Sequence, residues 1–167
     1  MKKFERVLLV CGLSAIAVPA WAGTATTTFG VSGTVVPTCS VSAAPMSFGA
    51  TIPGSISANV DATTTITATC ATGSSYSVSL NAGLGAGATF ATRRMTSGAN
   101  TLAYSLFLDS GRTDVWGDGV AGTTAGAAFF TTGTGGAQAL TVFGRIPAPQ
   151  TIPTGLYSDT ITVTVTF

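Results

Sequence analysis

The chain has 167 residues, a formal net charge of +1, and charged side chains at only 8% of its positions. So sparse and balanced a set of charges offers no surface for nucleic acid or anionic lipid, which excludes binding to either. The sequence contains no histidine, so a Ser-His-Asp triad cannot be built, and acid–base chemistry in residues 23–167 would rest on aspartate. We do not expect an enzyme.

The first 22 residues have the pattern of a secretory signal peptide. Basic residues precede an apolar run over residues 7–18, and a small-residue site predicts cleavage between Ala22 and Gly23. The run is too short to span a bilayer, and Cys11 lies inside it without the small neighbour that a lipid-attachment site needs. We expect residues 23–167 to be exported as one domain with no membrane insertion.

A strand-like segment follows the signal peptide at residues 29–35. Its apolar or small positions alternate with small polar residues, and Pro37, which has no ladder donor, separates it from the rest of the chain. The alternating positions are Phe29, Val31, Gly33 and Val35. The pattern fits an ordinary first strand as well as a detachable arm over residues 23–37.

Two cysteines remain once the signal peptide is removed, Cys39 and Cys70. An even number of cysteines in an exported chain favours a disulfide over a metal site or a catalytic thiol. The bridge would close a loop of about thirty residues and stabilise the fold by about 3–4 kcal/mol in the chain-entropy model.

The remaining composition favours strands. Thr, Ser, Ala, Gly and Val dominate, and the segments that alternate apolar and polar residues are separated by Gly-rich turns. The expected strands cover residues 64–70, 76–80, 102–108, 140–146 and 157–167, with loops at 83–88 and 117–128. Short strands at this spacing predict an all-β sandwich of two antiparallel sheets.

Two groups of charged residues fall between the expected strands. Arg93 and Arg94 could form an interaction patch, but two adjacent cations in a loop are more often solvated, and we assign them no role. Asp109, Asp114 and Asp118 lie within ten residues among glycines, but their spacing matches no standard calcium loop, and turn residues explain them as well. No metal and no other cofactor is expected.

Five aromatic residues could form either the core or a sugar-binding surface. The alternation pattern favours the core, because it places most of them where the inward face of a sandwich needs large side chains. They are Tyr104, Phe107, Trp116, Phe129 and Phe130.

The clearest alternation lies in the last eleven residues, where the sequence stops inside a strand. A sandwich that ends on such a strand is expected to leave an unpaired edge and an open groove. The apolar face of this edge comprises Tyr157, Ile161, Val163, Val165 and Phe167.

The arm and the groove edge are compatible in length. A strand over residues 29–35 covers about 20 Å, and burying Phe29, Val31 and Val35 in a neighbour's groove would contribute about 2 kcal/mol each. Such strand addition between subunits runs head to tail and does not close, so it builds a fibre.

Several stretches, spread in order over residues 45–167, resemble the spore coat U family, which includes the major subunits of Csu-type, or archaic, chaperone–usher pili. They are PMSFG at 45–49, TITATCATGSSYSVSLNAG at 65–83, RRM at 93–95, LAYSLFLD at 102–109, Arg112-Thr113, WGDG at 116–119, VFGRIPAPQ at 142–150 and GLYSDTITVTVTF at 155–167.

The resemblance implies an immunoglobulin-like sandwich that lacks its last strand and is completed by donor-strand exchange. It implies a periplasmic chaperone that lends a strand, and an outer-membrane usher where the next subunit's arm replaces it. By the family pattern, the donor positions are Phe29, Val31, Gly33 and Val35, the disulfide joins Cys39 to Cys70, and the pilin domain covers residues 38–167. Gly33 departs from the pattern, because it supplies no side chain between large neighbours.

The expected function is that of a shaft subunit whose partners are copies of itself and other pilus subunits. The fibre would lie on the cell surface and promote attachment and biofilm formation. Two alternatives remain open at this point: a structural protein of a spore or cell coat with the same fold, and a monomeric β-sandwich that binds carbohydrate.

Overall fold

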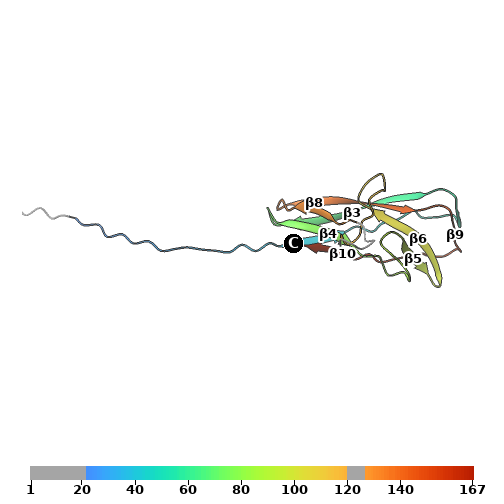
Figure 1. Cartoon of the computed structure of the whole chain (residues 1–167), viewed down its shortest axis with the longest axis horizontal. Coiled ribbons are helices and arrows are strands. Elements are labelled where there is room, and N and C mark those ends of the chain that lie inside the picture. Colours follow the sequence, from blue (N-terminus) through green and yellow to red (C-terminus); the bar gives the residue numbers. More distant parts are fainter. Residues whose placement is uncertain (1–21, 120–126) are drawn as a thin grey trace, which may run out of the picture. The chain divides into compact units, whose positions relative to one another are not determined.

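The computed structural model describes residues 22–119 and 127–167, and the chain divides into two units, residues 1–34 and 35–167. The expected signal peptide lies outside the described residues except for Ala22. In the first unit, residues 22–34 contain no helix or strand, and their side chains are exposed. All described strands belong to the second unit (Figure 1).

The second unit is all-β, as predicted: its described residues form ten strands and no helix. The strands are β1 (Cys39–Ala43), β2 (Ser55–Ile56), β3 (Val60–Cys70), β4 (Ser75–Leu80), β5 (Arg93–Ser97), β6 (Asn100–Phe107), β7 (Phe129–Thr132), β8 (Ala137–Ile146), β9 (Gln150–Thr151) and β10 (Val163–Thr166).

Two sheets form the layers of a sandwich. The larger sheet has the strand order β1-β3-β8-β6-β5, the smaller one β10-β4-β7, and β2 pairs with β9. Every ladder is antiparallel. Figure 1 shows β3 and β8 in one layer, with β4 and β10 in the other. The sandwich architecture predicted from the sequence is confirmed.

The core lies between these layers, because alternate residues of each long strand point inward. In β3 the inward residues Ile66, Ala68 and Cys70 are buried, while the threonines between them lie on the outer face. β4 and β8 contribute in the same way to one apolar cluster, through Tyr76, Val78, Leu80, Leu140, Val142 and Ile146.

The gap between β6 and β4 is closed by the segment around Trp116. The Trp116 main-chain N–H donates to Leu106 O on β6 at 2.9 Å, and Leu80 N on β4 donates to Gly117 O at 3.0 Å. The indole is 1% exposed and donates from Nε1 to Val78 O at 2.9 Å. The segment therefore joins the two sheets and fills the space between them.

Arg93 is fully buried at the start of β5, so its interpretation as a solvated loop residue is wrong. Its guanidinium donates to three main-chain oxygens, those of Asn81 at 3.0 Å, Phe90 at 2.9 Å and Trp116 at 2.6 Å. Burial lowers the pKa of Arg93 to about 10, which leaves the group charged at neutral pH. The hydrogen bonds replace the water that the charge loses.

The C-terminal strand is shorter than the predicted strand over residues 157–167. β10 pairs with β4 only from Val163 to Thr166, and an isolated bridge joins Ser158 to Thr96 of β5. Side chains interrupt the ladder between these points, because Asn81 Oδ1 accepts the N–H of Thr162 at 2.9 Å while Asn81 O accepts from Arg93.

Five of the described strands were not predicted: β2 and β9 have two residues each, and β1, β5 and β7 are short and lack large alternating side chains. β1 consists of small residues (CSVSA), β5 begins with two arginines, and β7 is Phe-Phe-Thr-Thr. Of the aromatic residues expected in the core, Tyr104 and Trp116 are buried, and Phe107 and Phe129 are half-buried. Phe130 is 70% exposed, because β7 turns it to the outer face.

Candidate functional site

The first edge of the candidate site is β1, which has a strand partner on one side only within the described residues. Ala44 N donates to Thr65 O at 3.0 Å, and Thr38 O accepts from Ala71 N at 2.9 Å, so the even-numbered residues face β3. In an antiparallel pair the intervening residues direct their N–H and C=O groups away from the partner. Those of Val41 and Ala43 therefore point to the open side of β1.

The second edge is β10, which pairs with β4 alone among the described strands. Asn81 N donates to Thr162 O at 3.1 Å, so here too the even-numbered residues face the partner strand. The main-chain groups of Ile161, Val163 and Val165 point to the open side. The same residues turn their side chains toward the core, against which they pack half-buried.

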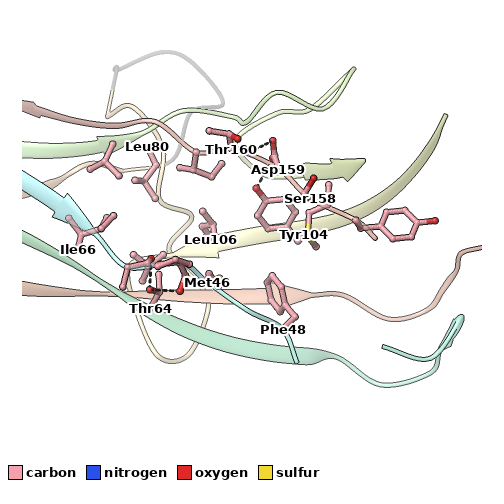
Figure 2. A pocket seen from close by; sticks show the side chains of 18 residues that line it. Met46, Phe48, Thr64, Ile66, Leu80, Tyr104, Leu106, Ser158, Asp159 and Thr160 are labelled. Carbon is pink, nitrogen blue, oxygen red and sulfur yellow. Dashed lines mark hydrogen bonds between the residues drawn. The ribbon is translucent and has the colours of Figure 1, made fainter. Parts of the chain in front are cut away.

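A groove of about 400 Å³ lies between these two edges. Its apolar lining comes from buried residues of the core between the sheets: Ile66, Leu80, Leu106 and Val142. Figure 2 shows the groove, with Leu80, Thr160 and Asp159 on one side and Thr64 and Met46 on the other. Its rims comprise Ala43, Ala44, Pro45, Met46 and Phe48, and Tyr157, Ser158, Asp159, Thr160, Ile161 and Val163.

The groove continues into a second hollow of about 270 Å³, which shares Met46, Phe48, Met95 and Tyr157 with it. The PMSFG motif, which follows β1, therefore lies where the two hollows meet. Gly144 on β8 leaves the space that the Met46 side chain fills, since a Cβ there would overlap the Met46 sulfur.

Asp159 is a charged residue in the otherwise largely apolar lining of the groove. Asp159 is half-buried and accepts hydrogen bonds from the Tyr104 hydroxyl at 2.7 Å and from Leu84 N at 2.8 Å. Burial, followed by the hydrogen bond to Asp159, raises the pKa of Tyr104, so the phenol stays protonated and donates. Asp159 shares its face with Tyr157 and Ile161, but the sequence analysis did not single it out.

The groove-edge residues predicted from the sequence fall into two sets. Tyr157, Ile161 and Val163 line the groove. Val165 packs half-buried against the core beyond it, and Phe167 is 56% exposed. Their role as an acceptor edge remains a prediction.

The predicted donor residues are exposed. Phe29, Val31 and Val35 have exposed fractions of 87%, 85% and 94%, and residues 22–37 form no strand. The first strand of the domain is β1, so residues 29–35 do not serve as its first strand. The donor role of Phe29, Val31, Gly33 and Val35 is taken up below as a proposal.

The predicted disulfide between Cys39 and Cys70 is confirmed. It joins the first residue of β1 to the last residue of β3, so it fixes β1 to its only described partner strand.

The aspartates considered for calcium include Asp109, which organises its own loop. Its carboxylate accepts from Thr113 N at 2.9 Å, Asp114 N at 2.8 Å and the Thr113 hydroxyl at 3.1 Å. These bonds lower the pKa of Asp109, the bond from Asp114 most of all. Within residues 22–119 and 127–167, no three His, Cys, Asp or Glu side chains gather as a metal site would require, and no helix could span a membrane.

Comparison with known proteins decides the family. The Spore Coat Protein U domain matches residues 25–164, which is most of the chain. The chain belongs to the spore coat protein U domain family. It is also similar to Protein U of Myxococcus xanthus, with 31% identity over 163 residues that cover 89% of this chain and 88% of the relative. The resemblance seen in the sequence motifs is therefore confirmed.

Solved structures of pilus subunits are similar to this family member. A chain from the complex of the CsuC chaperone with the CsuE tip adhesion subunit, from the archaic chaperone–usher Csu pili of Acinetobacter baumannii, matches with 30% identity and a TM-score of 0.54. The match covers 80% of this chain and 40% of that chain, so this protein spans less than half of its neighbour's length. The minor tip subunit HdaB of the E. coli Hda pilus has 15% identity, a TM-score of 0.43 and coverages of 75% and 80%, and this weaker likeness supports neither fold nor function.

Proposed function

We propose that this protein is a structural subunit of a chaperone–usher pilus, in which residues 23–37 of one copy fill the groove of the next. The observation that carries the proposal is the groove itself. It is an apolar channel flanked on both sides by strand edges, whose free main-chain N–H and C=O groups point into the opening between them. A strand placed there would pair with both edges at once and cover the core between them.

The arm has the properties that such an occupant needs. Its apolar residues alternate with polar ones, so a strand over residues 29–35 presents Phe29, Val31 and Val35 on one face. These side chains are exposed in the isolated chain, and burying each would contribute about 2 kcal/mol. Because the donor and the acceptor lie on different copies, the assembly grows head to tail into a fibre.

The groove also explains the proposed partners. Until a second copy arrives, the apolar channel needs a temporary occupant, and a periplasmic chaperone that lends a strand would supply it. The similar solved chain comes from a pre-assembly complex of the CsuC chaperone with the CsuE tip adhesion subunit, which supports a chaperone as partner. An outer-membrane usher would then exchange that strand for the arm of the next copy. We assign the protein to the shaft of a surface fibre that serves attachment and biofilm formation.

Replacing Val31 by Asp tests the proposal. The variant would bury an uncompensated carboxylate in the neighbour's groove, so we expect fibres to be lost from the cell surface. The matched control is Ser32→Asp, which places the same charge one residue along, on the face turned away from the groove. Fibres are counted by electron microscopy, and exported subunit is quantified in the periplasm.

Normal fibres with Val31→Asp would contradict the donor assignment. Equal loss with both substitutions would show that any charge in the arm prevents assembly, which would also contradict a groove-facing role for Val31.

A further inference from the structure

The groove contains an unusual residue for a channel that receives apolar side chains. Four residues of its C-terminal rim turn inward on the same strand face: Tyr157, Asp159, Ile161 and Val163. Three of them are large and apolar, and the fourth is the carboxylate fixed by Tyr104 and Leu84. A strand that fills the groove must place one of its own inward positions directly against this carboxylate.

The direction of an incoming strand follows from the sheets. Every ladder in the described structure is antiparallel, and the antiparallel arrangement is the more stable per residue. A donor strand that continues the smaller sheet beyond β10 therefore runs antiparallel to it. Its odd-numbered residues then lie opposite the odd-numbered residues of the rim, whose main-chain groups are directed to the open side.

We propose that Asp159 and Tyr104 set the register of the donor strand by accepting Gly33 opposite the Asp159 side chain. This inference rests on the proposed function. In this register, Val35 lies opposite Tyr157, Val31 opposite Ile161, and Phe29 opposite Val163. The one donor position without a side chain meets the one charged position of the rim, and each apolar donor residue meets an apolar residue.

Neighbouring registers lack this match. A donor strand can shift only in steps of two residues if its apolar face is to stay inward. A shift of two in one direction places Val31 against Asp159, and a shift of two in the other places Val35 there. Either valine would press a branched apolar side chain onto the carboxylate, which is already engaged by Tyr104 and Leu84. The carboxylate cannot move aside without breaking the hydrogen bonds that hold it, those from Tyr104, Leu84 and Thr160 N, so the overlap penalises both shifts.

Disulfide formation between introduced cysteine pairs tests the register of the donor strand directly. Two variants are co-exported, each with one cysteine added to the native disulfide, the first in the arm and the second in the rim. Only strand exchange between copies can then bring the two added cysteines together. Directly opposite residues in a hydrogen-bonded pair have Cα atoms about 5.5 Å apart, within the span of a disulfide, whereas diagonal neighbours are about 7–8 Å apart.

The pair Val31→Cys with Ile161→Cys reports the proposed register. The pair Val31→Cys with Val163→Cys reports a shift of two in one direction, and Phe29→Cys with Ile161→Cys reports the opposite shift. We expect the first pair to give about tenfold more covalent dimer than either other pair on a non-reducing gel of boiled samples. Reductant should return all of the dimer to monomer.

The outcomes separate this inference from the proposed function. Preferential linkage in either shifted pair would overturn the register while leaving strand exchange in place. Unboiled multimers without linkage in any of the three pairs would also overturn the register. Monomers alone in unboiled samples, with no linkage in any pair, would overturn strand exchange itself.

A matched pair of glycine substitutions gives an independent readout that needs no cysteine. Gly33→Val should reduce the yield of unboiled multimers by about tenfold or more, because the new side chain meets Asp159 in a filled groove. Gly30→Val makes the same chemical change on the opposite face of the arm and should leave the yield unchanged. Equal yields from the two variants would overturn the assignment of Gly33.

Discussion

Of two gaps between the sheets of this sandwich, one is closed by the chain itself and the other is open. The gap between β6 and β4 is closed by the chain itself, through the main-chain bonds of Trp116 and Gly117 and the buried indole. The gap between β1 and β10 has no such segment within the described residues, and the side chains on its rim are half-buried or exposed. The fold is thus complete on one side and, on our account, depends on a second copy on the other.

Closing a gap between the two sheets requires both apolar side chains and main-chain hydrogen-bonding groups. Trp116 closes its gap because a loop delivers a large side chain together with main-chain donors and acceptors for both sheets. The open gap needs the same two things, apolar bulk and a hydrogen-bonding backbone, and a strand supplies both. The arm over residues 29–35 is the part of the described chain that offers them without being engaged in a strand.

The largest effect is expected from closing the open gap within one chain. In this variant the original arm is removed, and a copy of residues 25–36 is attached after Phe167 through the linker Asn-Gly. This linker favours a tight hairpin, which places Ala25 opposite Phe167 in the proposed register. This protein should be a monomer that melts on the order of 20 °C higher than the same fusion with Val31→Asp in the attached copy. Thermal denaturation followed by circular dichroism measures the shift, and equal melting temperatures would contradict the account.

The next effect comes from opening the closed gap. In the fused monomer, Trp116→Ala should lower the free energy of unfolding by about 3–5 kcal/mol, because it removes the buried indole and its bond to Val78. Phe130→Ala is the matched aromatic control and should change it by less than about 0.5 kcal/mol, since that ring is exposed. Urea titration compares the two variants, and similar losses would mean that Trp116 does not close a gap.

The smallest effect is expected on the outer face of the larger sheet, away from both gaps. Arg145 donates two hydrogen bonds to Asp61 at 2.8 and 2.9 Å, and chiefly for this reason the pKa of Asp61 lies below its ordinary value of 3.8. A lowered pKa means that the carboxylate stabilises the fold above pH 3.8 and that this contribution is lost as the pH falls through the folded-state pKa.

Asp61→Asn should therefore lower the melting temperature of the fused monomer slightly at neutral pH, and the difference should vanish in acid. The pair is solvent-exposed, so screening keeps the effect small. Melting curves of both proteins across the acid range measure it. A difference that grows as the pH falls would contradict the assignment of the lowered pKa to this pair.

The sequence predicted those elements whose alternation reflects burial. The strands around Ile66, Val78 and Val142 were expected because their inward and outward residues differ sharply in polarity. The disulfide between Cys39 and Cys70 followed from the cysteine count and the exported context. The overall family was evident from motifs spread along the chain.

Residues whose environment comes from distant contacts could not be placed in this way. Arg93 is buried because three main-chain oxygens from separate segments converge on it, and adjacent arginines in a sequence carry no sign of that. Asp159 interrupts an apolar face, and its hydrogen bonds from Tyr104 and Leu84, 55 and 75 positions away in the chain, explain why it is tolerated there. For the arm, alternation indicated a strand but could not name its partner.

The central claim is that copies of this protein are joined by strands rather than by surface contact. It is tested most directly by electrophoresis of the natively exported protein in detergent without reductant, with and without boiling. Subunits linked by an inserted strand unfold slowly, so the account predicts a ladder of multimers without boiling that collapses to monomer after strong heating. A single monomer band in both samples would contradict it and would favour a self-contained secreted binding domain.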